Sequence, residues 1–137
     1  MNTSDLYEVW DEYTEARDSL SYVQCCWEDE SVETKMLCHH IYNSIYNLTG
    51  CVIKLSGWKL PATVEARVKM VYNIMKTDRP PSDCTRYLNW ELATSRYETL
   101  PTRVECASTA YNLEIWALRL KKHFQELSGI SVFYYAF

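Results

Sequence analysis

The sequence predicts an all-α, single-domain bundle of five to seven helices around a buried central helix, and three observations predict it. Apolar residues recur three and four positions apart through most of the chain, as they do on one face of a helix. The chain contains only 3 Gly and 4 Pro, too few turn-forming residues for a many-stranded sandwich or barrel. Its 137 residues suit one domain with a buried core, and no linker or internal repeat divides residues 1–137.

The first helix is predicted to run from about residue 4 to about residue 22. Ser4 and Asp5 at its start are good capping residues. Apolar residues then follow at helical spacing on one face, namely Leu6, Val9, Trp10, Tyr13, Ala16 and Leu20. Acidic residues occupy the other face, as in an amphipathic helix.

The second helix is predicted to begin after Ser31, which can cap it. Its apolar face consists of Met36, Leu37, Ile41, Ile45, Leu48 and Val52. Gly50 costs a helix something like 1 kcal/mol against Ala, so we expect a kink or an early end near it. Ser56-Gly57 is a firmer stop.

Prolines delimit the third and fourth predicted helices. Pro61 suits the first position of a helix, and apolar residues follow at Val64, Val68, Val71, Tyr72 and Met75. Arg79-Pro80-Pro81 ends this helix, and Ser82-Asp83 can cap the next one. The helical pattern then continues through Tyr87, Trp90, Ala93, Thr94 and Tyr97 to a break or strong kink at Leu100-Pro101.

The last predicted helix runs from Thr102 to about Gln125 and carries two apolar stripes. One stripe is Val104, Ala107, Tyr111, Ile115 and Leu118, and the other is Leu113, Trp116, Leu120 and Phe124. A helix that is apolar on two faces is surrounded by other helices, so we expect this one to be central or next to central. Gly129 is expected to end it, before a short apolar terminal piece at 132–137.

Composition and charge argue against several classes of function. The net charge is −4 and no basic stripe is present, which gives nucleic-acid binding little support. No apolar run approaches the length of a membrane span, and the N-terminus lacks the pattern of a signal peptide. The 6 cysteines are therefore interpreted as free, buried thiols in a reducing compartment.

No catalytic residue set, cofactor site or small-molecule substrate site is expected, and the protein is interpreted as not an enzyme. The strongest metal candidate is Cys38-His39-His40 with Cys25-Cys26. It lacks the paired spacing of zinc ligands, and adjacent histidines point to different faces of a helix. No metal site is therefore predicted.

Two segments resemble the B-cell lymphoma 2 family of apoptosis regulators. Residues 89–98, which begin with Asn89-Trp90, resemble the first homology region of that family. Residues 124–133, with Ser128-Gly129 before aromatic residues, resemble the second. The run from Pro61 to Met75 is similar to the family helix that precedes the Asn-Trp pair. The order of these segments and the total length agree with the family.

The resemblance implies an anti-apoptotic protein that sequesters the amphipathic death-motif helix of a pro-apoptotic partner in a surface groove. Partners of the Bim, Bak and Bax class are expected. A homodimer of this chain is a further possible association. The implied groove residues are Ile45, Leu48, Val52, Val68, Val71, Tyr72, Met75, Leu88, Asn89, Leu92 and Arg96. The aliphatic residues among them could equally be plain core.

The chain departs from the family pattern at the groove arginine. Glu91 and Leu92 stand where the family has glycine and the arginine that pairs with an aspartate of the partner. Arg96 and Arg86 are the candidates to replace that ion pair, and Asn89 could still hydrogen-bond the aspartate. The lost arginine motivates an alternative function, in which a viral protein of the same fold binds signalling adaptors of innate immunity.

The chain also lacks the membrane tail that is common in the family. A short, diverged and tail-less member resembles viral pro-survival proteins. The implied location is the host cytoplasm, with peripheral association at mitochondria as an option.

Overall fold

The computed structural model describes residues 3–89 and 100–128, and all regular structure in these two ranges is helical. The helices are α1 (Thr3–Cys26), α2 (Thr34–Leu55), α3 (Val64–Ile74), the short 3-10 helix η1 (Ser82–Tyr87) and α5 (Arg103–Ser128). The all-α prediction is therefore confirmed for the described residues. The predicted helix between Tyr87 and Leu100 falls largely on residues outside them.

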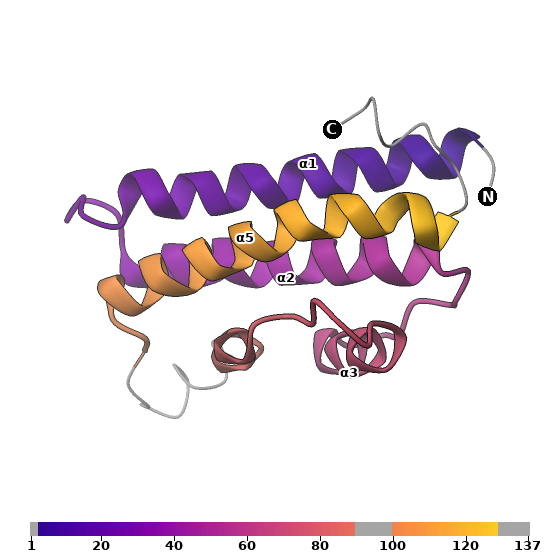
Figure 1. The fold of residues 1–137 in the computed structure, drawn as a ribbon. Coiled ribbons are helices and arrows are strands. Elements are labelled where there is room, and N and C mark those ends of the chain that lie inside the picture. The colour runs from indigo at the N-terminus through magenta and orange to yellow at the C-terminus, as the bar shows by residue number, and fades with distance from the viewer. Residues whose placement is uncertain (1–2, 90–99, 129–137) are drawn as a thin grey trace.

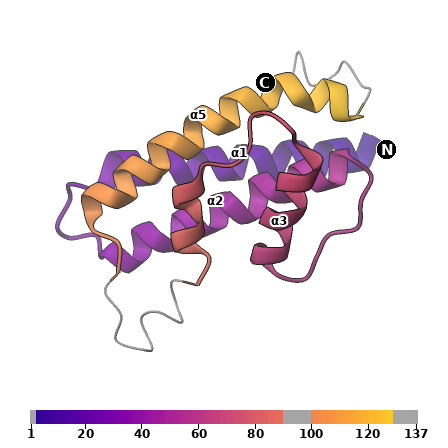
Figure 2. The same ribbon diagram turned by 60° about the horizontal axis from the view of Figure 1, so that its bottom comes forward.

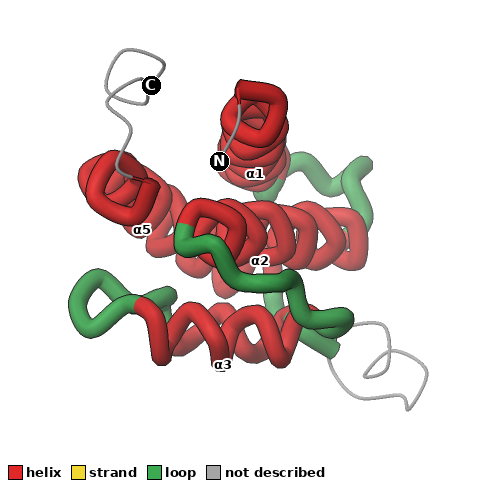
Figure 3. The backbone as a smooth tube through the Cα atoms, turned by 90° about the vertical axis from the view of Figure 1, so that its right-hand side faces the viewer, coloured by secondary structure: helices red, strands yellow, loops and turns green. Residues whose placement is uncertain are grey.

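The helices are arranged around α2, with α1 and α5 on one side of it and α3 and η1 on the other. Helices α1, α2 and α5 run alongside one another, and α3 and η1 lie across the opposite side of α2 (Figures 1 and 2). The view in Figure 3 places α2 between α1 and α5 on one side and α3 on the other. Helix α2 contacts each of the other four helical segments, most extensively α1, so it is the central helix of the described fold.

The prediction that the last helix is apolar on two buried faces was wrong. Its stripe Leu113, Trp116, Leu120 and Phe124 is buried against the rest of the molecule. The other stripe lies on the outside, where Val104 is 65%, Tyr111 59% and Leu118 44% exposed. Helix α5 is an edge helix that packs on α1, α2 and η1 through one face.

Helix α2 is buried around most of its circumference, which explains its central place. Between Lys35 and Lys54 the sequence contains no Asp, Glu, Lys or Arg. The segment from Ser44 to Leu55 is buried except at Tyr46 and Lys54. A helix without a charged face is stable only inside the molecule.

Three predictions about α2 need correction. The helix continues through Gly50 and ends at Leu55, so the expected early end does not occur. Met36 is 41% exposed and does not belong to the buried face. Ser31 bonds Asp29 through both its backbone and its hydroxyl, and Glu33 occupies the N-cap position. The predicted stop is confirmed, since Gly57 follows with a positive φ of 79°.

The boundaries of the remaining helices differ modestly from prediction. Helix α1 extends to Cys26, beyond the predicted residue 22. Helix α3 begins at Val64, not at Pro61, and Thr63 caps it, since the Thr63 hydroxyl accepts the backbone N–H of Ala66 at 3.2 Å. Helix α3 ends at Ile74, ahead of the prolines, and Pro81 rather than Ser82 occupies the N-cap position of η1.

Four of the cysteines, Cys38, Cys51, Cys84 and Cys106, are buried as free thiols. Their apolar surroundings agree with the interpretation of these residues as small hydrophobic side chains.

Candidate functional site

The aliphatic residues of the implied groove lie in the core. Ile45, Leu48, Val52, Val68, Val71 and Met75 all belong to one buried cluster, and none is more than 5% exposed. In this conformation they are not presented to a partner. A partner helix can reach them only if a neighbouring helix moves.

Tyr72, Leu88 and Asn89 are the described groove candidates that reach solvent. The Tyr72 hydroxyl donates to the carbonyl of Pro80 at 2.7 Å, which holds the loop after α3 against the helix. The side-chain amide of Asn89 donates to Glu65 Oε1 at 3.4 Å. This contact joins the residues after η1 to the first turn of α3, so Asn89 would have to leave Glu65 to bond an aspartate of a partner.

Of the two ion-pair candidates, the structure places only Arg86. Its guanidinium pairs with Glu105 near the start of α5, and both side chains are more than one-third exposed. Exposed pairs of this kind contribute about 0–1 kcal/mol, so a partner carboxylate can compete with Glu105 at small cost. Leu92 and Arg96 lie outside the described residues, as do Trp90 and Gly129.

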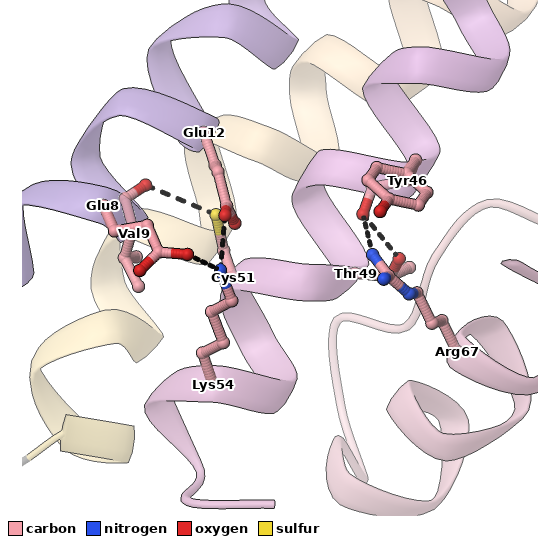
Figure 4. A network of polar contacts seen from close by, with 8 residues as sticks. All are labelled: Glu8, Val9, Glu12, Tyr46, Thr49, Cys51, Lys54 and Arg67. Atoms are coloured by element: carbon pink, nitrogen blue, oxygen red, sulfur yellow. Dashed lines mark hydrogen bonds and ion pairs between the residues drawn. The ribbon is translucent and has the colours of Figure 1, made fainter. Parts of the chain in front are cut away.

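Arg67 is a buried polar residue of α3 that sequence reasoning did not single out. Its side chain is held by the carbonyl of Tyr46 through Nη1 and the carbonyl of Pro61 through Nε, each at 3.3 Å. The guanidinium also lies 3.9 Å from the centre of the Tyr46 ring, which gives a cation–π contact. Arg67 thus fastens α3 to α2 (Figure 4). The signal was available, because Arg67 falls three residues after Val64, on the apolar face of α3.

Gly50 explains how this arginine fits. A Cβ atom at Gly50 would lie 3.3 Å from Arg67 Nη1 and 3.6 Å from Glu12 Oε2. The first distance is tighter than ordinary van der Waals contact. The glycine therefore gives the guanidinium its room against α2 and does not serve as a helix end.

A second polar contact joins α1 to α2. The ammonium of Lys54 contacts both Glu8 and Glu12, two residues one turn apart on α1 (Figure 4). The hydrogen bond and the charge of Lys54 lower the pKa of Glu8. Burial opposes the charge of Lys54, but its bonds to Glu12 and Glu8 outweigh burial and raise its pKa.

Asp78 organises the turn between α3 and η1 and ties it to α5. Its backbone has a positive φ of 52°. Its carbonyl accepts the indole N–H of Trp116 at 2.6 Å, and its carboxylate lies 2.7 Å from His123 Nε2. The hydrogen bond with His123 lowers the pKa of Asp78 against the opposing effect of burial, and the charges of His123 and Arg119 add to the lowering.

The histidines of the metal candidate have separate surroundings. His39 shares a hydrogen bond of 3.2 Å with Asn43, whereas His40 stacks on Tyr22 at 4.2 Å between ring centres. Burial, aided by His39, lowers the pKa of His40. Within residues 3–89 and 100–128 no three His, Cys, Asp or Glu residues are grouped closely enough to hold a metal ion. The helices of the same ranges include none that is both long and apolar enough to span a bilayer.

Comparisons with known protein families, with curated proteins and with solved structures find no match to this chain.

Proposed function

We propose that this chain is a helix-binding protein of the anti-apoptotic class, without catalytic activity. It sequesters the amphipathic death-motif helix of a pro-apoptotic partner of the Bim, Bak and Bax class. The partner helix binds on the side of α2 that α3 and η1 cover. The proposed class of protein rests on the resemblance of residues 89–98 and 124–133. The proposed binding surface rests on the packing of α3.

The observation that supports this place is the isolation of α3. This helix has 11 residues and, among the described helices, makes extensive contact with α2 alone. Helices this short are marginal in water by themselves, so α3 depends on its contact with α2. It is the described α-helix that can shift at the smallest loss of packing. A partner helix with apolar residues at the same spacing can compete for the surface that α3 covers.

Calorimetry with a panel of death-motif peptides tests the proposal. Each peptide is titrated into the purified protein, with a scrambled peptide of the same composition as control. At least one peptide is expected to bind with a Kd in the micromolar range or tighter, which corresponds to about −8 kcal/mol or better. Failure of every peptide to bind would sink the proposal.

A pair of tyrosine variants locates the binding surface. Tyr72→Ala removes a half-buried aromatic side chain at the edge of the implied groove. Tyr111→Ala is the matched control, since Tyr111 is 59% exposed on the outer face of α5. We expect Tyr72→Ala to weaken binding by on the order of 1–2 kcal/mol, or roughly 5- to 30-fold in Kd. Tyr111→Ala should leave Kd unchanged, and equal losses in the two variants would contradict the proposed surface.

A second candidate follows from the missing groove arginine, since Leu92 stands at that position in the sequence. If no arginine is free to meet the aspartate of a death motif, the same fold can serve another partner class. That candidate is a signalling adaptor of innate immunity, as in the alternative inferred from the missing groove arginine. Adaptor capture by the purified protein, together with no binding to any death-motif peptide, would select it.

A further inference from the structure

Two buried cysteines from different helices face each other in the core. Cys38 of α2 and Cys106 of α5 are both fully buried, and their Sγ atoms lie 3.9 Å apart. A disulfide bond is about 2.05 Å long, so each sulfur needs to move by roughly 1 Å to form one. The two residues are 68 positions apart in the chain, and the segment between them includes α3 and η1.

The surroundings prepare one sulfur of the pair to act as the nucleophile. The contact with the Cys38 thiol lowers the pKa of Cys106, against the opposing effect of burial. The nearby hydroxyl of Tyr87 and the charges of Arg103 and Arg86 add to the lowering. The same contact, together with burial, raises the pKa of Cys38.

The hydroxyl of Tyr87 is a second observation at the same place. It is buried and has no hydrogen-bond partner of ordinary geometry within the described part of the chain. This hydroxyl lies close enough to Cys106 to lower the pKa of that thiol, and Thr109 is a second neighbour of the same hydroxyl.

We propose that Cys38 and Cys106 are a redox modification site, at which a hydroperoxide converts the dithiol into a disulfide that joins α2 to α5. The Cys106 thiolate attacks one oxygen of the hydroperoxide and the O–O bond breaks, which leaves a sulfenic acid on Cys106 and a hydroxide or alkoxide. The sulfur of Cys38 then attacks the sulfur of Cys106 and displaces hydroxide, which leaves as water with the Cys38 proton. The two sulfurs together lose two electrons, and the hydroperoxide gains them.

The inference does not depend on the proposed function. It rests on the distance between the two sulfurs and on the groups around them. A crosslink between α2 and α5 restricts the unfolded chain, so the oxidised protein is expected to resist denaturant better than the reduced one.

Mass spectrometry of the oxidised protein tests the site. Cys25 and Cys26, the cysteines of the described chain that reach solvent, are first replaced in a Cys25→Ser/Cys26→Ser variant. The folded variant is treated with hydrogen peroxide, its remaining thiols are alkylated in denaturant, and it is digested without reduction. The expected digest contains one crosslinked peptide pair that carries Cys38 and Cys106. The mass of this pair is two hydrogens below the sum of the two reduced peptides. Recovery of both as alkylated thiols would overturn the proposal, as would a crosslink between other cysteines.

Two further variants in the same background serve as controls. Cys51→Ser changes another buried cysteine and should leave the crosslink yield as it was. Cys106→Ser should abolish the crosslink. Should Cys106→Ser fail to fold, the starting variant is equilibrated in a glutathione redox buffer with and without urea. At least a tenfold larger equilibrium constant for the Cys38–Cys106 disulfide in the folded protein supports the site, and equal constants would contradict it.

Discussion

Arg67 attaches α3 to α2 and also favours a glycine at the neighbouring position 50. Its guanidinium is buried among the carbonyls of Tyr46 and Pro61 and the ring of Tyr46. A Cβ atom at Gly50 would lie 3.3 Å from Arg67 Nη1, so the glycine leaves the guanidinium more room there. Glycine at position 50 makes helix α2 less stable than alanine would by about 1 kcal/mol, and the contacts of Arg67 offset this loss.

A double-mutant cycle tests this coupling. In the wild type, the Cβ of Gly50→Ala presses on the guanidinium, so the variant should fail to gain the roughly 1 kcal/mol that alanine brings to a helix. In an Arg67→Met background the crowding is relieved and the gain should appear. The free energy of unfolding of all four proteins, measured in urea, gives a coupling energy of about 1 kcal/mol or more if the account is correct. Additive effects would show that Gly50 does not serve Arg67.

Asp78 makes stability depend on acid. Its pKa is lower in the folded protein than in the unfolded chain because of the bond with His123. A carboxyl of this kind stabilises the fold at pH values above its unfolded pKa, and the contribution is lost as pH falls through the folded pKa.

The comparison with Asp78→Asn isolates this effect, since asparagine also tolerates the positive φ at this position. The wild type should be the more stable protein at neutral pH, and the difference should disappear as pH falls through the ordinary carboxyl pKa of 3.8 and then through the lower pKa of the folded protein. Urea unfolding across that range measures it. A difference that is constant with pH would mean that the Asp78 carboxylate contributes nothing through its charge.

Among the helices, α5 departs most from its sequence pattern. Its apolar residues occupy two stripes, but only the stripe that contains Leu113 is buried. The outer residues are large and exposed, so they have no stabilising role inside the described core.

Two identical substitutions on α5 separate the stripes. Leu113→Ala removes a fully buried side chain and should cost about 2–5 kcal/mol in the free energy of unfolding. Leu118→Ala changes the same residue type in the same helix at a site that is 44% exposed, and it should cost less than about 1 kcal/mol. Thermal or urea unfolding provides both values. Comparable costs would mean that α5 is covered on both faces.

The helices that could be predicted were those with a clean apolar repeat. Helix α1, the buried stripe of α5 and the stop at Gly57 followed from local patterns that burial did not change. Apolar stripes alone could not identify which helix is central. The exposed apolar residues of α5 form a second stripe, which in the sequence looks the same as a buried face. The uncharged run between Lys35 and Lys54 is the feature that marks α2 as the interior helix.

The start of α5 also carried a readable signal. Thr102 and Glu105 bond each other reciprocally: the Thr102 hydroxyl accepts from the backbone of Glu105 at 3.1 Å, and the Glu105 carboxylate accepts from the backbone of Thr102 at 3.2 Å. This is a capping box, and its Thr-x-x-Glu spacing is visible in the sequence. The contacts that place the candidate site were not readable, because the pairing of Asn89 with Glu65 joins positions 24 residues apart.

For the whole molecule, partner binding is expected to involve a change of conformation and not docking on a rigid surface. The aliphatic side chains assigned to partner binding are in the core while α3 covers α2. Binding is therefore expected to require movement of α3, and the free energy of that movement reduces the apparent affinity for any partner. Variants that loosen α3, such as Arg67→Met, are expected to lower the free energy of unfolding and to raise the affinity for the partner.

The most direct test is nuclear magnetic resonance of the isotopically labelled protein during titration with a death-motif peptide. We expect the largest shifts on α3, on Leu88 and Asn89, and on the face of α2 beneath α3. The amides around Tyr111 and Leu118 should stay in place. Shifts confined to the outer face of α5, or no shifts at saturating peptide, would contradict the account.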